Sequence, residues 1–314
     1  MIRYLLRRLG FLLLTIILTS LLIFIITQLL PGDVARVILG REASDTAVEA
    51  LRQELGLNRP LPIQYLTWLG HFVTGDWGKS YSTNLPIRPL VLERLGNSLM
   101  LAGLTVLVSI PLSVGLGVLA GLNENKAVDN VISVASLSVV VLPEFVTGLV
   151  LIHLLSFTFH LFPANSSIEN GSSFWDALPM LVLPALTATL VLLAYIARLT
   201  RAGVVEELKR PYVRTAALKG LPQRTVVVKH VLRNALLPTV TVIAISFGWL
   251  ISGLIVIENV FNYPGLGRLL IFAIDRRDLP LLQAITLIAV VGFSLSNLAA
   301  DLLYAFLNPR IRLG

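Results

Sequence analysis

Few residues of this chain have the type and spacing to carry chemistry, and the first candidates are polar groups inside apolar runs. Glu144 follows Pro143 in one long run, and Asp301 lies four residues after Asn297 in another. A charge inside a membrane costs about 2.5–3.5 kcal/mol, so these side chains should face a protein interior or water. We predict that Glu144 lines a polar path, or stabilises a helix start at a break at Pro143, and the two roles are compatible. Asn297 and Asp301 are expected to pair inside a helix bundle or to contact a solute.

Patterns that would indicate an enzyme are weak. The four histidines, at positions 71, 153, 160 and 230, have no partners at metal-ligand spacing, and the absence of cysteine excludes disulfides and thiolate metal sites. Gly78-Lys79-Ser80 resembles the end of a phosphate-binding loop, but that motif needs a glycine where Val73 stands. No paired acids or Ser/Lys arrangement occur at useful spacing. We therefore predict no catalytic residue, no metal and no ATP site in this chain.

The composition indicates a membrane protein. Hydrophobic residues make up 55% of the 314 positions and charged residues 14%, and the mean hydropathy is +0.82. These values lie outside the range of soluble domains. The net charge of +7 lies mostly at the ends of apolar runs, where membrane topology explains it without nucleic-acid binding.

Apolar runs and charge bias predict an all-α polytopic protein with six transmembrane helices and both termini in the cytoplasm. The basic start, the basic end and a basic block near residue 210 should lie inside, whereas residues 31–96, with seven Lys/Arg and seven Asp/Glu, fit the outer side. The predicted spans are 9–30, 97–122, 131–162, 178–196, 235–257 and 282–307. The predicted domains are a first span (1–30), an extracytoplasmic helical segment (31–96), a five-helix core (97–308) with a cytoplasmic loop (199–235), and a cytoplasmic tail (309–314).

Two outer segments should be folded. A capping pattern at Thr46 and Glu49 predicts one helix in the first of them, and the spacing of Ile63, Leu66 and Leu69 predicts another. The second segment follows the fifth span and has aromatic residues around a Pro-Gly turn. It is predicted to be a folded connection or a lid over a polar path, and its candidate gate residues are Glu258, Phe261, Pro264 and Gly265.

The basic block contains a short helix that must dock on something. Nine Lys/Arg and two acids lie from Arg198 to Arg233, a range that we call the basic segment. Pro211 and Gly220 delimit about nine helical residues, too few for a helix that is stable alone. One of its faces carries small residues, so it is expected to fit a partner's groove, to pack on its own bundle, or to lie on the membrane surface. The candidate docking residues are Pro211, Tyr212, Val213, Arg214, Thr215, Ala216, Ala217, Lys219, Gly220 and Leu221.

At this segment the chain resembles ABC importer permeases, whose short cytoplasmic helix carries a Glu-Ala-Ala motif with a glycine three residues later. Here the match is Thr215-Ala216-Ala217 with Gly220, and threonine replaces the acid. The departures resemble the dipeptide/oligopeptide/nickel branch, in its first permease subunit. Supporting stretches run through most of the chain: Ile2 to Leu9, Leu30 to Asp33, Gly75 to Gly78, Arg233 to Pro238, Glu258 to Arg268 and Asp301 to Arg312.

The resemblance implies a type I ABC importer permease in the bacterial inner membrane. It implies a paralogous permease as heterodimer partner, an external substrate-binding protein, and cytoplasmic ATPase subunits that hold ATP and Mg²⁺ and contact the helix at 211–220. The alternative is a self-contained six-span channel or proton-driven carrier, which would need an internal repeat or a relay of intramembrane charges. Short peptides, glutathione-like compounds and nickel complexes are not distinguished by the sequence.

Overall fold

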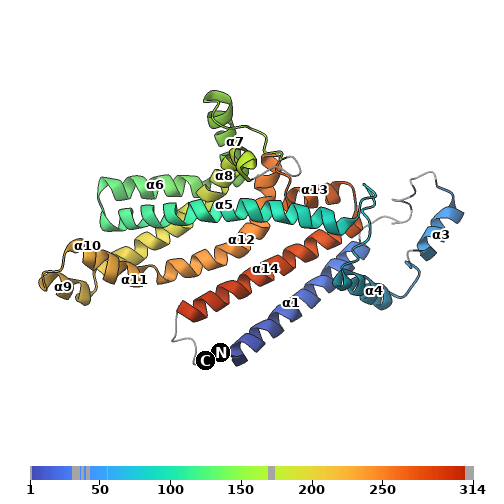
Figure 1. The fold of residues 1–314 in the computed structure, drawn as a ribbon, viewed down its shortest axis with the longest axis horizontal. Coiled ribbons are helices and arrows are strands. Elements are labelled where there is room, and N and C mark those ends of the chain that lie inside the picture. Colours follow the sequence, from blue (N-terminus) through green and yellow to red (C-terminus); the bar gives the residue numbers. More distant parts are fainter. Residues whose placement is uncertain are drawn as a thin grey trace. The chain divides into compact units, whose positions relative to one another are not determined.

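The chain folds into two compact units, which Figure 1 shows as ribbons. A computed structural model describes residues 2–29, 36, 39, 43–54, 56–168 and 174–307. The first unit comprises Met1–Asn97 and Gly265–Leu295, and the second comprises Ser98–Pro264 and Ser296–Gly314. The predicted cytoplasmic tail, 309–314, lies outside the described residues.

The described part is helical and has no named strand, in agreement with the predicted all-α class. Four of its helices are long and apolar enough to cross a membrane: α1 (Ile2–Leu29), α5 (Ile87–Leu122), α8 (Phe174–Leu208) and α14 (Leu279–Leu307). Two shorter consecutive helical segments, 127–141 and 144–158, are apolar enough together, and they give a fifth span if the bent pair crosses the membrane as a single unit. Helix α12 (Leu237–Val260) covers most of the fifth predicted span, 235–257. Some of its side chains are not among those that the structure describes. Six spans and cytoplasmic termini remain predictions.

The predicted interruption at Pro143 is confirmed. Helix α6 (Ala127–Val141) ends two residues before Pro143, and α7 (Glu144–Leu151) begins directly after it, at an angle of 109°. Proline disfavours helical backbone at the residue before it, and Leu142 is extended here. A π-helical stretch, η1 (Ile152–Thr158), continues α7.

In the first unit, two short helices follow α1. Helix α3 (Asp45–Glu54) begins one residue before the predicted Thr46, because the Ser44 hydroxyl accepts a hydrogen bond from the Ala47 N–H and so caps the helix. Helix α4 (Leu61–Thr74) confirms the second predicted helix and ends at Gly75, whose φ of 87° is left-handed. The unit is completed by the start of α5, by α13 (Leu266–Asp275) and by most of α14.

A buried carboxylate ties the turn before α5 to the start of α14. Asp278 is fully buried and accepts hydrogen bonds from the Ser80 hydroxyl at 2.5 Å and from the Ser82 hydroxyl at 2.7 Å. Its other oxygen accepts from the Leu281 N–H in the first turn of α14. Around this tie lies a buried apolar cluster of Ile87, Val91, Leu266, Ala273, Leu281, Ala284 and Ile285.

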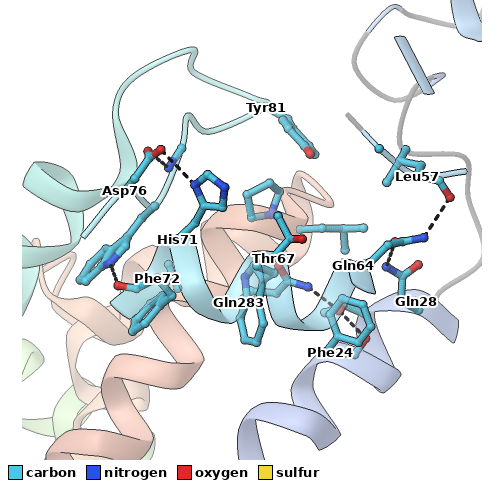
Figure 2. A pocket seen from close by; sticks show the side chains of 18 of the residues that line it. Phe24, Gln28, Leu57, Gln64, Thr67, His71, Phe72, Asp76, Tyr81 and Gln283 are labelled. Carbon is cyan, nitrogen blue, oxygen red and sulfur yellow. Dashed lines mark hydrogen bonds and ion pairs between the residues drawn. The ribbon is translucent and has the colours of Figure 1, made fainter. Parts of the chain in front are cut away.

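A pocket of about 390 Å³ in the same unit lies between α1, α4 and the start of α14 (Figure 2). Polar side chains cross its floor, where the Gln283 amide donates to the Thr27 hydroxyl at 2.7 Å and the Gln28 amide donates to Gln64 at 3.2 Å. At the rim, His71 lies 3.2 Å from Asp76, and this contact lowers the pKa of the Asp76 carboxyl.

In the second unit, α8 is central, and α6, α7 and α12 pack on it. Helix α5 also contacts α8 closely, because a Cβ at Gly117 would lie 2.6 Å from Cβ of Thr200, and one at Gly121 would lie 2.8 Å from Cβ of Val204. The two glycines lie one helical turn apart, and the absence of side chains there allows this close approach. The main core comprises Leu101, Ile152, Ala177, Leu181, Leu183, Ala185, Ala188, Leu192, Ile196, Leu250, Leu254, Ile257, Phe261 and Tyr263.

The buried Asp278 should be a major source of stability in the first unit. We expect Asp278→Ala to lower the free energy of unfolding by about 2–4 kcal/mol, since it removes hydrogen bonds to a charged group and leaves the Ser80 and Ser82 donors without their acceptor. Asp275→Ala, at an exposed site on α13, is the matched control and should change it by less than about 0.5 kcal/mol. Thermal unfolding of the purified protein measures both, and equal melting temperatures would contradict the assignment.

Candidate functional site

The predicted short helix of the basic segment is present as α9 (Pro211–Leu218). Arg210 precedes it in an extended conformation, and Pro211 is its first residue, where a missing N–H costs nothing. The helix ends because Gly220 adopts a left-handed φ of 77°, and the Gly220 N–H donates to the carbonyl of Ala217 at 3.0 Å. The chain then continues through α10 (Gln223–Thr225), the π-helical η2 (Val226–Val231) and α11 (Leu232–Ala235) into α12.

Helix α9 divides the predicted docking residues between two faces. Val213 and Ala216 pack on the chain itself, against a buried cluster of Val204, Val226, Val231 and Ala235. No residue of α9 is fully buried, and Leu218, which the sequence did not single out, has 81% of its surface exposed. The exposed face comprises Arg214, Thr215, Ala217, Leu218, Lys219, Gly220 and Leu221.

Tyr212 fixes α9 to the helices on either side of it in the chain. Its hydroxyl donates to the Glu207 carboxylate of α8 at 2.6 Å and accepts from the Asn234 amide of α11 at 3.3 Å. Burial and the hydrogen bond to Glu207 raise the pKa of the Tyr212 phenol, so it stays protonated and able to donate. Tyr212 therefore holds α9 in place from within the chain.

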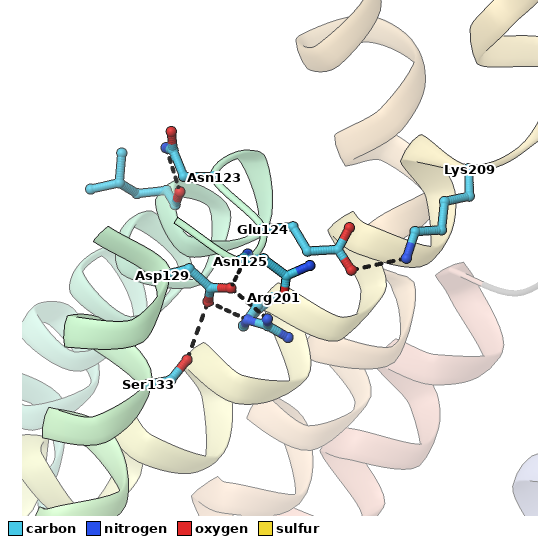
Figure 3. Close-up of polar contacts among 8 residues, drawn as sticks. Asn123, Glu124, Asn125, Asp129, Ser133, Arg201 and Lys209 are labelled. Atoms are coloured by element: carbon cyan, nitrogen blue, oxygen red, sulfur yellow. Dashed lines mark hydrogen bonds and ion pairs between the residues drawn. The ribbon is translucent and has the colours of Figure 1, made fainter. Parts of the chain in front are cut away.

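An ion pair joins the basic segment to the first turn of α6 (Figure 3). The Arg201 guanidinium on α8 donates from Nε to Oδ1 of Asp129 at 2.5 Å and from a terminal nitrogen to Oδ2 at 2.6 Å. Asp129 has only 1% of its surface exposed and also accepts from the Asn125 N–H at 2.9 Å and the Ser133 hydroxyl at 3.2 Å. A two-point contact of this kind fixes orientation as well as distance.

Further charges of the basic segment are also paired. Lys209 lies 2.9 Å from Glu124 in the α5–α6 turn, and Arg210 lies 2.8 Å from Glu206 on α8. In addition, α11 packs so closely on α8 that no side chain would fit at Gly203, where a Cβ would meet the carbonyl oxygen of Ala235. The ends of α5, α6 and α8 and the segment α9–α11 are thus connected by charges, hydrogen bonds and close backbone contacts.

The sequence analysis did not identify Asp129. It falls in the stretch 123–130, which reads as a short polar turn, but α6 already begins at Ala127 and places Asp129 in its first turn. A usable signal was present, because Asn125, Asp129 and Ser133 are four residues apart and would share one helix face. The partner, Arg201, could not be inferred, since the pairing depends on how α6 packs on α8.

The predicted path residues do not form one cluster. Glu144 is the first residue of α7 and is half-buried, and its buried Oε2 has no hydrogen-bond partner among the described residues. Asn297 and Asp301 are half-buried, one turn apart in the second half of α14. A groove of about 580 Å³ runs between α5 and α11–α12, and its described lining includes none of these three residues.

The candidate gate residues lie in a packed turn. Glu258, near the end of α12, is 1% exposed and accepts a hydrogen bond from the Ser98 hydroxyl at 2.5 Å. Phe261 is fully buried, and its carbonyl accepts from the Ser166 N–H. Burial and the charge of Glu258 raise the pKa of the neighbouring Tyr263 phenol. Pro264 and Gly265 are also buried, so these residues form a folded connection into α13.

Two parts of the chain match known families of membrane transport proteins. Residues 113–313 match the family described as binding-protein-dependent transport system inner membrane component, and residues 1–102 match its N-terminal membrane component. The chain belongs to this family and is a permease subunit of an ABC importer. It is a multi-pass protein of the bacterial inner membrane.

Individual relatives extend over the full length. The chain is 37% identical to the probable peptide ABC transporter permease protein y4tP of Sinorhizobium fredii, over 98% of this chain and 99% of the relative. It is 37% identical to the glutathione transport system permease protein GsiC of Escherichia coli K12, over 99% of each chain. A solved amino acid ABC transporter with histidines shares the fold, with a TM-score of 0.53 and 17% identity over 69% of this chain and 94% of the other. These matches do not favour a self-contained channel or proton-driven carrier.

The buried ion pair should be worth more than the exposed one beside it. A double-mutant cycle of Asp129→Asn and Arg201→Gln should give a coupling free energy of at least about 1.5 kcal/mol, because Asp129 is buried and the half-buried Arg201 contacts it at two points. The matched cycle of Glu124→Gln and Lys209→Gln should give about 0.2–1 kcal/mol, as is usual for exposed pairs. Unfolding of the purified protein supplies all the values, and equal coupling in the two cycles would refute the distinction.

Proposed function

We propose that this chain forms, with a paralogous permease, the membrane path of an ATP-driven importer for short peptides or glutathione-like solutes. The observation that carries the proposal is α9: an eight-residue helix, anchored through Tyr212 and exposed at Leu218, lies in the segment that resembles the ATPase-binding motif of such permeases. A substrate-binding protein delivers the solute on the outer side, and ATPase subunits bind the basic segment from the cytoplasm.

The substrate class rests on the named relatives. One is a probable peptide permease and another a glutathione permease, and the similarity to each covers nearly all of this chain. Glutathione is itself a short peptide, so the two names agree on peptide-like cargo. Nickel complexes, which the sequence left open, receive no support from these relatives.

Coupling in this proposal runs through α9 as part of a rigid body. Closure of the ATPase dimer displaces α9, and the Tyr212 contacts pass the displacement to α8 and α11. The Asp129–Arg201 pair carries it from α8 to α6, and the close contacts at Gly117 and Gly121 carry it to α5. Helices that move together in this way alternate the access of a central path between the two membrane sides.

The contacts of α9 within the chain support one of its faces as the one that enters a partner's groove. The sequence favoured a small-residue face that includes Tyr212, Val213 and Ala216, but these residues are engaged with the chain itself. The partner face is then the opposite one, with Ala217 and Leu218 between Arg214 and Lys219. Its most exposed large apolar side chain, Leu218, fits a pocket, and the two cations suit acidic groups around that pocket.

Path and gate roles complete the proposal. Glu144 has an unpartnered buried oxygen at the start of α7, where it can meet the amino group of a passing peptide. Asn297 and Asp301 offer further polar contacts on α14. The turn that contains Glu258, Phe261, Pro264 and Gly265 serves as the outer gate, because its close packing makes it able to block the path until α12 moves.

Bulk on the exposed face of α9 should uncouple transport. Ala217→Trp should reduce substrate uptake at least tenfold, because a close fit between α9 and a groove leaves no room for an indole, whereas Ala217→Ser should retain uptake. Uptake in cells and copurification of the ATPase subunits measure the effect, with membrane insertion as the control for folding. Normal uptake and normal copurification by the tryptophan variant would contradict this docking mode.

Glu144 is tested by removing its charge alone. Glu144→Gln keeps the shape of the side chain, so the complex should assemble, but uptake or substrate-stimulated ATP hydrolysis should change because the buried acidic oxygen is lost. Glu124→Gln, in the α5–α6 turn, is the control for a general effect of charge. Unchanged transport by the Glu144 variant across substrates and pH would leave Glu144 only the role of supporting the helix start after Pro143.

A further inference from the structure

Helix α4 in the first unit has an apolar face that no described residue covers. Ile63, Leu66 and Val73 have 47%, 65% and 78% of their surfaces exposed. Ile63, Leu66 and Val73 recur at intervals of three and seven residues, which places them along one side of the helix. Apolar patches that face water promote aggregation, so we expect this side of α4 to contact lipid or protein.

The neighbouring side of α4 is polar and faces the pocket of Figure 2. Gln64, Thr67 and His71 are spaced by three and four residues and line this pocket. His71 and Thr67 are exposed, and His71 contacts the exposed Asp76. The helix therefore has a water-facing polar side and an apolar side, which is the pattern of a helix that lies in a membrane surface.

Contacts with α1 fix the depth of α4 relative to that membrane span. The Tyr65 hydroxyl lies 2.8 Å from the Ser20 hydroxyl, and the ring of Phe24 lies 5.5 Å from that of Tyr65 and 6.0 Å from that of Trp68. Ser20 is nine residues before the end of α1 at Leu29, or about 14 Å at 1.5 Å per residue. The aromatic side of α4 thus reaches well inside the length that α1 spans.

Polar contacts mark where the membrane interior ends. Gln28 is hydrogen-bonded to Gln64, and Thr27 is hydrogen-bonded to Gln283 in the second turn of α14. The C-terminal end of α1 and the N-terminal end of α14 therefore carry polar side chains that contact each other. Below this level, α1 exposes Leu22, Ile25 and Ile26, which face lipid because α1 crosses the membrane. Helix α4 thus packs on a helix whose own exposed residues are apolar at this depth.

We propose that α4 lies in the membrane surface at the end of α1, with Ile63, Leu66 and Val73 immersed in the acyl chains of that leaflet. By the predicted orientation this is the extracytoplasmic leaflet. Tyr65 and Trp68 hold the helix to α1 at the depth where aromatic rings are favoured, and the pocket on its other side opens toward the lipid headgroups and water. This inference depends on α1 as a membrane span and not on the substrate or the partners.

The absence of cysteine from the chain permits a direct test. Single cysteines at Leu66 and Val73, and at the pocket-lining Thr67 and His71 as controls, are introduced into the full chain within its purified complex and reconstituted into phospholipid vesicles. Each is labelled with a nitroxide, and its collision rates with oxygen and with a water-soluble nickel chelate are measured. Leu66→Cys and Val73→Cys should show an oxygen-to-nickel ratio several times that of Thr67→Cys and His71→Cys.

Two results would overturn the inference. Similar ratios at all four positions would mean that both sides of α4 are in water. Low collision rates with both reagents at residues 66 and 73 would mean that protein, either a partner or another segment of this chain, covers the apolar side. Substrate uptake by each labelled variant shows that it has assembled, and Ile63→Cys, on the same side of α4, replaces either test position if a variant fails to assemble.

Discussion

The interaction on which much of the second unit depends is the contact between Asp129 and Arg201. Neither group could remain charged in an apolar environment without the other, and the Asn125 N–H and the Ser133 hydroxyl satisfy the remaining acceptor capacity of the carboxylate. The pair determines how α6 lies on α8, and Gly117 and Gly121 allow α5 to approach α8 on another side. With those three helices fixed, the position of α9 follows, because Tyr212 and the cluster around Val226 connect it to α8 and α11.

Local signals in the sequence were sufficient for much of the fold. Prolines and glycines act on their own backbone, so the break at Pro143 and the end of α9 at Gly220 were predictable and are confirmed. The start of α3 was misplaced by two residues, because a serine at 44 offers the same cap as the threonine at 46.

What could not be predicted depends on contacts between distant residues. The partners of Asp129 and Asp278 lie 72 and 198 residues away in the chain, and no local rule connects such positions. Helix α13 was missed although Leu266, Leu269, Leu270 and Ala273 have helical spacing, because the Pro-Gly turn before it dominated the interpretation as a loop. The packing of Val213 and Ala216 on the chain itself could not be predicted for a similar reason: small residues suit a partner's groove and a close intramolecular contact equally well.

The two units share helices, and this limits how the protein can be recombined. Helix α5 passes from one unit to the other between Asn97 and Ser98, and α14 does so between Leu295 and Ser296, while the third crossing lies in the turn before Gly265. A one-residue insertion near either helical crossing would rotate everything beyond it by about 100°, since a helix has 3.6 residues per turn. Chimaeras that exchange one unit between relatives must therefore preserve helical phase at two junctions, and natural length variation should be confined to the loops.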